Sequence, residues 1–195
     1  MLLQGWGMHK LVLTLARAMA INGGLVLTAL VLMTCVSVAG RVLNGWLHGD
    51  FGQSVAPGRA QRLLDMGVGP LQGDFELVEA GMAFSIFAFL PLCHITRGHA
   101  SVDIFTSWMP ALMIRVIGVL VDVVFAAVLI LIAQRLYVGM LDKIAYNETT
   151  YLIQFPIWWA YAASFCAACV AALVSVYVVF ARFAGVLPDP GEVDV

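Results

Sequence analysis

Four long apolar runs fill most of this 195-residue chain and decide the solvent in which it folds. A helix rises ~1.5 Å per residue, so about 20 residues cross the ~30 Å hydrocarbon core of a bilayer. The runs have about that length and cover Ala18–Ala39, Glu76–Ile95, Ala111–Ala133 and Pro156–Phe180. The sequence therefore predicts an all-α integral membrane protein. We expect one domain over residues 1–195, an antiparallel bundle of four transmembrane helices.

The composition agrees with a membrane solvent. Hydrophobic residues make up 62% of the chain and charged residues 11%, whereas a soluble domain is usually ~45–50% apolar and ~25% charged. The formal net charge of −2 and the lack of a basic cluster in the sequence favour neither nucleic acid nor anionic lipid headgroups as specific partners. With so little mass outside the bilayer, the sequence predicts neither an enzyme nor a cofactor bound to this chain.

The segments between the runs are expected outside the hydrocarbon core. Met1–Arg17 is a mixed stretch, typical of an amphipathic helix that lies at the interface before the chain turns into the bilayer. Residues 40–75 form the longest connector, within which Pro57–Met66 has the pattern of a short helix. A polar connector covers Gln134–Phe155, and the acidic tail at 188–195 is predicted to be disordered.

The four cysteines indicate packing rather than redox chemistry. Cys166 and Cys169 have C-x-x-C spacing, but they lie inside a predicted membrane helix without the strand or loop of a redox motif. We expect them at a helix–helix contact, where small residues are favoured. Disulfides are not expected, because Cys35 and Cys93 also lie within or at the end of apolar runs.

The basic residues encode the orientation of the bundle only weakly. An even number of helices places both termini on one side, and lysine and arginine normally concentrate in cytoplasmic segments. The ten basic residues divide evenly between the side of the termini (Lys10, Arg17, Arg97, Arg115, Arg182) and the other side (Arg41, Arg59, Arg62, Arg135, Lys143). Because the long first connector dilutes its three charges, we expect both termini in the cytoplasm.

One stretch of the sequence resembles a known family. Glu76 and Glu79 open a membrane helix, the stretch RGHASVD at residues 97–103 follows that helix, and RVLN at residues 41–44 closes the helix before it. In order and spacing these elements resemble the small membrane subunit, DctQ-like, of tripartite ATP-independent periplasmic (TRAP) transporters. The four-helix layout extends the resemblance over nearly the whole chain. The long first connector is a departure from the family pattern.

The resemblance implies a location and a role. It implies a multi-pass protein of the bacterial inner membrane with cytoplasmic termini and a periplasmic connector at 40–75. It also implies a heterodimer with a large membrane subunit that carries the substrate and sodium sites, so that no cofactor is expected in the small one. A periplasmic binding protein delivers the substrate, often an organic acid, in a transient contact. The small subunit is then a scaffold for sodium-driven import.

Asp122 is the one clear charge near the centre of a predicted span. An aspartate there costs ~2.5–3.5 kcal/mol on insertion scales, so its side chain is expected to face protein or water rather than lipid. The first interpretation is a buried hydrogen-bonded or paired contact, within the bundle or against the partner. The second is an ion or proton site, although one carboxylate without a second midplane acid makes a poor cation cage.

Two further groups of polar residues are candidate contacts. Glu76 and Glu79 lie in the first turns of their helix, and Arg135 of the antiparallel neighbour is expected at the same level, which predicts an ion pair or hydrogen-bonded cluster. The alternative is that both carboxylates face water. Arg97, His99 and Asp103 are expected to cap helix ends in the following connector, or to contact the large subunit.

The last two spans also carry small residues that permit close helix approach and mark a flank for the partner. They are Gly118, Ala126, Ala127, Ala160, Ala163, Ala167 and Ala168.

Two other functions remain as alternatives. A haem-bearing cytochrome b-type anchor requires axial histidines on facing helices at similar depth, and the histidines are His9, His48, His94 and His99. Of these, His94 alone falls within or near the end of a predicted span; a Soret band would reveal haem. A self-contained, homo-oligomeric transporter or channel would need a polar pore, for which the helices offer few lining groups.

Overall fold

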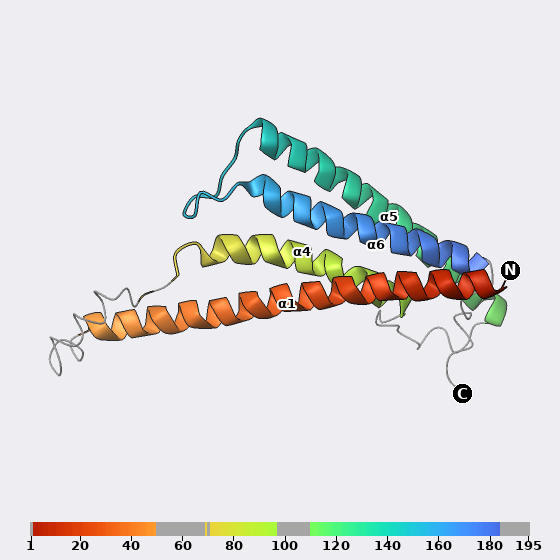
Figure 1. The fold of residues 1–195 in the computed structure, drawn as a ribbon, viewed down its shortest axis with the longest axis horizontal. Helices are drawn as coiled ribbons and strands as arrows, with labels where there is room; N and C mark the ends of the chain where they lie inside the picture. Colours follow the sequence, from red (N-terminus) through yellow and green to blue (C-terminus); the bar gives the residue numbers. More distant parts are fainter. Residues whose placement is uncertain (1, 50–68, 70, 97–109, 184–195) are drawn as a thin grey trace.

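The computed structural model describes residues 2–49, 69, 71–96 and 110–183, which form four helices (Figure 1). The helices are α1 (Leu2–His48), α4 (Asp74–Ile95), α5 (Ala111–Ala145) and α6 (Ile157–Phe183). Each is long and apolar enough to cross a membrane. The predicted all-α architecture with four candidate spans is confirmed.

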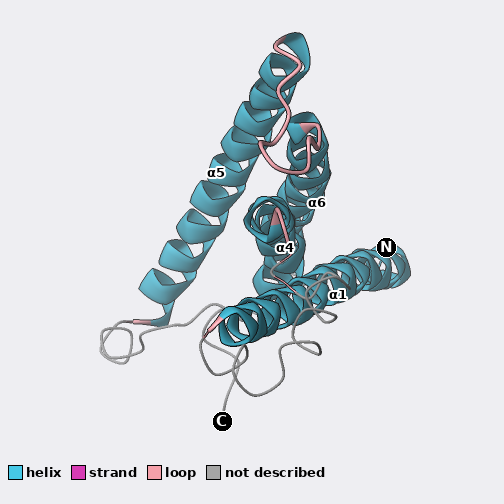
Figure 2. Ribbon diagram, turned by 90° about the vertical axis from the view of Figure 1, so that its left-hand side faces the viewer, coloured by secondary structure: helices cyan, strands magenta, loops and turns pink. Residues whose placement is uncertain are grey.

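The helices pack in the order α1, α4, α6, α5 (Figure 1). Consecutive helices are antiparallel, so the central pair, α4 and α6, runs in the same direction. In the end-on view α5 leans away from α1 (Figure 2). We call the end where α1 begins and α6 finishes the terminal end, and the opposite end, where α4 and α6 begin, the hairpin end.

Helix α1 is much longer than the predicted span. It continues without interruption from Leu2 to His48, so the predicted turn between an interface helix and a membrane helix is wrong, and so is the predicted connector start at residue 40. The physical reason is the lack of a breaker, because the first proline of the chain is Pro57 and single glycines cost a helix only ~1 kcal/mol. At ~1.5 Å per residue, its 47 residues extend for about 70 Å.

Helix α5 also exceeds its predicted length. It continues past Ala133 to Ala145, because the polar residues that were expected to begin a connector are good helix formers. The helix ends where Asn147 adopts a left-handed φ of 49°. The other two spans agree closely with the prediction, although α4 begins at Asp74 and includes the buried Pro91.

Small residues form the seam between α1 and α4. Ala16, Ala20 and Gly23 are buried on one side of α1, with the three- and four-residue spacing of a helix stripe. A Cβ atom at Gly23 would lie 2.8 Å from the Cβ of Ala88, so the two backbones approach as closely as only glycine allows. Such close approach is how membrane helices gain packing energy, since lipid offers no hydrophobic drive between them.

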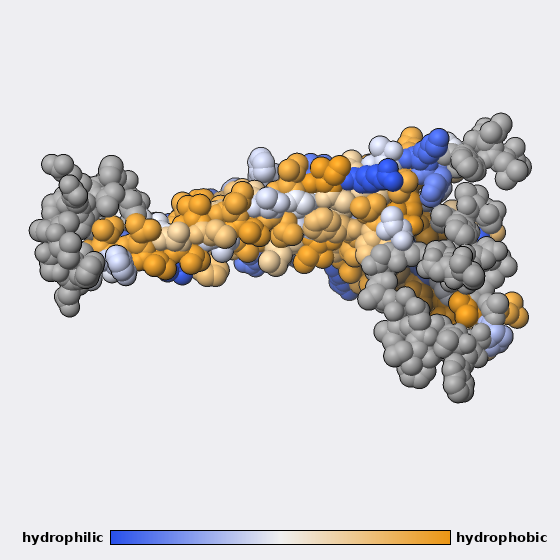
Figure 3. Space-filling view, turned by 90° about the horizontal axis from the view of Figure 1, so that it is seen from below, coloured by the Kyte–Doolittle hydropathy of each residue, from blue (hydrophilic) through white to orange (hydrophobic). Residues whose placement is uncertain are grey.

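The centre of the fold is small, and most large apolar side chains face outwards. Leu129 of α5 packs with Ala171 and Ala172 of α6, flanked by Leu90 and Phe125. Exposed leucines, valines and isoleucines run along α1 and α5, and the face in Figure 3 is mostly apolar along the long axis. This distribution is expected where lipid or a partner, rather than water, covers the helices.

Candidate functional site

A buried charge cluster joins three helices at the terminal end. The carboxylate of Asp122 in α5 forms an ion pair with the guanidinium of Arg182 in the last turn of α6. His94 Nε2, in the last turn of α4, lies 3.8 Å from Asp122 Oδ1. The His94 ring stacks on Phe125 with centroids 4.4 Å apart. Asp122, Arg182 and His94 are at most 7% exposed, so the cluster is an internal brace of the bundle.

The structure corrects the depth of Asp122. Asp122 lies about one third of the way along the 35-residue α5 rather than at its centre, at the level where α4 and α6 end. Two basic side chains near helix C-termini therefore surround it, where the helix dipole favours positive charge. Sequence reasoning missed Arg182 and His94 as its partners. The signal was present, because a lone acid in one membrane helix calls for an opposite charge in its neighbour.

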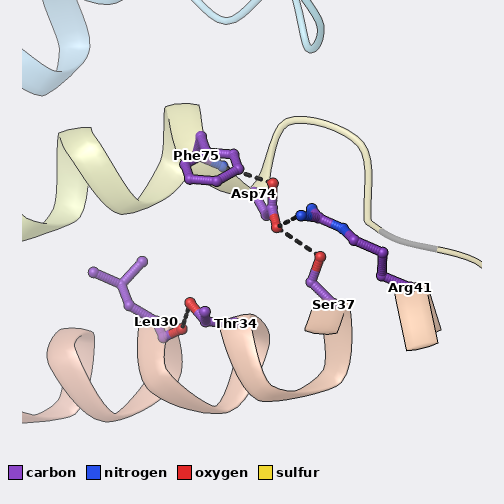
Figure 4. Close-up of polar contacts among 6 residues, drawn as sticks. All are labelled: Leu30, Thr34, Ser37, Arg41, Asp74 and Phe75. Carbon is purple, nitrogen blue, oxygen red and sulfur yellow. Dashed lines mark hydrogen bonds and ion pairs between the residues drawn. The ribbon is translucent and has the colours of Figure 1, made fainter. Parts of the chain in front are cut away.

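A second polar contact ties α1 to α4 at the hairpin end (Figure 4). Asp74 Oδ2 accepts a 2.6 Å hydrogen bond from Ser37 Oγ, and Asp74 Oδ1 accepts one from the N–H of Phe75. The guanidinium of Arg41 lies 3.7 Å from the same carboxylate, with its own side chain 55% exposed. The sequence interpretation placed Asp74 in the connector and missed this contact. Its N-terminal position in α4 was the available signal.

The acidic pair of α4 has separate roles in the structure. Glu76 accepts hydrogen bonds from the backbone N–H groups of Leu152 (2.8 Å) and Ile153 (3.1 Å). Arg135 is exposed on α5, and among the described residues no ion pair joins it to Glu76 or Glu79. The predicted cluster is thus wrong in its partner. Arg135 lies on a different face of α5 from its neighbour Leu136, which lines a pocket at the hairpin end.

The chain between α5 and α6 folds back as a hairpin that Glu76 anchors. Thr149 and Pro156 form an antiparallel bridge, and Gln154 has a left-handed φ of 56°. Lys143 Nζ bonds Glu148 Oε2 at 2.5 Å at the base. At the tip, Tyr151 is 94% exposed. Glu76 therefore ties the tip of the hairpin to the first turn of α4.

A pocket of about 480 Å³ lies beneath this hairpin, with walls from α4, α5 and α6. Glu76 and Glu79 lie on its α4 side, and Ser164 and Tyr161 line it from α6. The Ser164 hydroxyl is buried, and no hydrogen-bond partner for it exists among the described residues. The other lining side chains are mainly apolar and include Ala80, Ala83, Leu136, Phe155, Ile157 and Ala160.

Three predicted site residues and one predicted short helix lie outside the described residues. They are Arg97, His99, Asp103 and the helix at Pro57–Met66. Cys35, Cys166 and Cys169 are free thiols.

Of the small residues assigned to a partner flank, Ala126, Ala167 and Ala168 are instead buried inside the bundle. Ala127 and Ala163 are exposed.

The described histidines are at separate places. His9 stacks on Tyr177 with centroids 6.3 Å apart, and His94 belongs to the Asp122 cluster. His48 Nδ1 lies 3.0 Å from the carbonyl of Asn44 at the other end of α1 from His9. Across the described residues, no group of three or more His, Cys, Asp or Glu side chains is placed to hold a metal ion.

Four apolar helices joined by polar contacts define a multi-pass membrane protein. A comparison with family models matches residues 61–185 to the DctQ component of the tripartite ATP-independent periplasmic transporters. Since the match covers more than half of the chain, the protein belongs to the DctQ family, and the resemblance seen in the sequence is confirmed. Comparisons with curated proteins and with solved structures found no match. The family is the small membrane component of a transporter that also has a large membrane component and a periplasmic binding component.

Proposed function

We propose that this chain is the scaffold subunit of a sodium-driven TRAP transporter that imports an organic acid. It acts in a bacterial inner membrane with both termini in the cytoplasm. The hairpin end, including the 146–156 hairpin, then faces the periplasm. Family membership supports the role, and the even charge division with a diluted first connector supports the orientation.

The scaffold role is supported by two buried carboxylates, those of Asp122 and Asp74, which hold helices of the bundle together. Asp122 joins α5 to α6 and α4, and Asp74 joins α4 to α1. Both are engaged in contacts between helices. An acid that couples transport to an ion must instead meet a cavity through which the ion passes. A brace for another subunit needs rigidity, and these contacts supply it at both ends.

The proposed partners divide the remaining tasks. The large membrane subunit forms a heterodimer with this chain and holds the substrate and sodium sites. The periplasmic binding protein docks transiently at the hairpin end. Lipid covers whatever apolar surface of α1 and α5 the large subunit leaves open.

Co-purification and transport together test this proposal. The tagged chain, extracted from its native membrane in mild detergent, should bring down one large polytopic protein in equal amount. In proteoliposomes, uptake of an organic acid should require both proteins, the binding protein and an inward sodium gradient. Recovery of this chain alone as a stable homo-oligomer that transports by itself would overturn the proposal.

A further inference from the structure

The hairpin-end pocket combines two features that the packing of this chain leaves unexplained. The first is Glu79, which is exposed on the pocket rim and has no ion pair among the described residues. The second is Ser164, a pocket-lining residue that is 2% exposed and whose hydroxyl has no hydrogen-bond partner among those residues. A buried hydroxyl without a partner destabilises a fold, because it has given up its hydrogen bonds to water and gained none in return. Both features therefore favour an occupant that supplies polar groups.

The charge of the rim indicates the chemistry of that occupant. Glu76 and Glu79 both line the pocket, and no lysine or arginine does so among the described residues. Glu76 is engaged with the N–H groups of Leu152 and Ile153, which leaves Glu79 to meet a ligand. A cation is favoured there, and a phosphate is repelled. Since an anionic phospholipid headgroup carries a phosphate without a compensating cation, this rim disfavours anionic lipid.

The depth of Ser164 gives a second reason to choose protein over lipid. Ser164 lies seven residues after the start of α6, or about 10 Å along the helix axis. An acyl chain at that depth offers no group to bond its hydroxyl, whereas a protein helix carries polar side chains and backbone carbonyls. The alanines of the walls, Ala80, Ala83 and Ala160, leave room for such a helix to approach.

We propose that the hairpin-end pocket is the docking site for a membrane helix of the large subunit, which directs a lysine or arginine side chain to Glu79. The aliphatic stem of that side chain lies along the alanine walls, and its charged head remains at the rim. The same helix supplies the hydrogen-bonding group for Ser164. This inference rests on the proposed function, and it assigns the face of the bundle that meets the partner.

Photo-crosslinking in the intact complex tests the assignment. In a chain whose native cysteines are replaced by alanine, Ala160→Cys is labelled with a benzophenone maleimide and illuminated, and the adduct is identified by mass spectrometry. Leu25→Cys, on the exposed side of α1, is the matched control. We expect an adduct with one helix of the large subunit from residue 160, next to a lysine or arginine, and a much lower yield of it from residue 25.

A charge exchange tests the role of Glu79 independently. Glu79→Lys should lower the yield of the complex by at least about tenfold, because like charges that face each other across an interface repel. Reversing the crosslinked basic residue of the large subunit to glutamate should restore it. Asp142→Lys, an exposed acid of α5 outside the pocket, should change the yield less than about twofold. Far-UV circular dichroism of the isolated chain confirms that each variant folds.

The outcomes separate this inference from the proposed function. If the large subunit co-purifies but the probe at residue 160 labels only lipid, the pocket assignment fails and the scaffold role stands. Co-purification that Glu79→Lys leaves unchanged also refutes the assignment. If no large subunit co-purifies with the unmodified chain, the proposed function itself fails.

Discussion

The pair of Asp122 and Arg182 allows the sharpest test of how the bundle is held together. Asp122→Leu removes the carboxylate and leaves the guanidinium of Arg182, which is 7% exposed, buried without its counter-charge. Breaking a buried pair in this way costs about 3–5 kcal/mol. Membrane insertion should stay intact, because an aspartate removed from a membrane helix lowers the cost of insertion.

The double variant Asp122→Leu/Arg182→Leu should recover most of that loss. Replacing a buried pair by apolar residues is often neutral or stabilising, because neither charge then remains desolvated. The assay is reversible unfolding of the purified chain in mixed micelles, followed by far-UV circular dichroism. The coupling free energy of the double-mutant cycle should be at least about 2 kcal/mol, within the range for residues in direct contact.

Exposed ion pairs serve as the control. Arg41→Met removes a guanidinium that is 55% exposed and 3.7 Å from Asp74, so it should cost less than about 1 kcal/mol. Two results would show that the Asp122–Arg182 ion pair does not hold the bundle together. One is a loss of unfolding free energy from Asp122→Leu as small as that from Arg41→Met. The other is additive losses from Asp122→Leu and Arg182→Leu in the double variant.

Three further contacts give predictions with matched controls. Gly23→Val should destabilise the α1–α4 seam by about 1–3 kcal/mol in the same unfolding assay, because its Cβ would meet the Cβ of Ala88, whereas Gly24→Val, with nothing closer than 4.0 Å, should be near neutral. Ser37→Ala should cost about 1.5–3 kcal/mol of unfolding free energy, because it removes the charged hydrogen bond to Asp74. Thr34→Ala is the control and should cost less than about 0.5 kcal/mol, since among the described residues the Thr34 hydroxyl bonds only the carbonyl of Leu30. Equal losses in the two variants would contradict the interhelical role of Ser37. Glu76→Ala should speed amide hydrogen exchange at Leu152 and Ile153 at least about tenfold, because each amide loses a charge-assisted acceptor, and unchanged protection there would show that something else holds the hairpin.

The spans could be predicted from the sequence, and their ends could not. Hydrophobic length locates a membrane helix because the bilayer thickness fixes it. Leaving the hydrocarbon core does not by itself end a helix, however, and α1 meets no proline between Leu2 and His48. The same reasoning explains why α5 continues to Ala145 through Asp142 and Lys143, which are polar but compatible with a helix.

Side-chain partners proved harder to predict than helices. A buried or paired Asp122 follows from the cost of burying a lone charge, and the structure places it in an ion pair. The identity of its partner depends on the relative axial shift of α5 and α6, which hydropathy does not encode. For the same reason Glu76 was expected beside Arg135 but bonds to backbone amides of the hairpin.

The contact order of the helices has a consequence for how the chain assembles. The α1–α4 and α5–α6 pairs are two antiparallel hairpins, each made of neighbours in sequence, and the parallel α4–α6 seam joins them. Sequence-local contacts form faster than distant ones, so each hairpin can form in the membrane soon after its second helix is inserted. We expect the distant seam to close last, when His94 reaches the Asp122–Arg182 pair of the other half. His94 then joins two halves that formed independently, and its contact with Asp122 is expected to form after the contacts within each half.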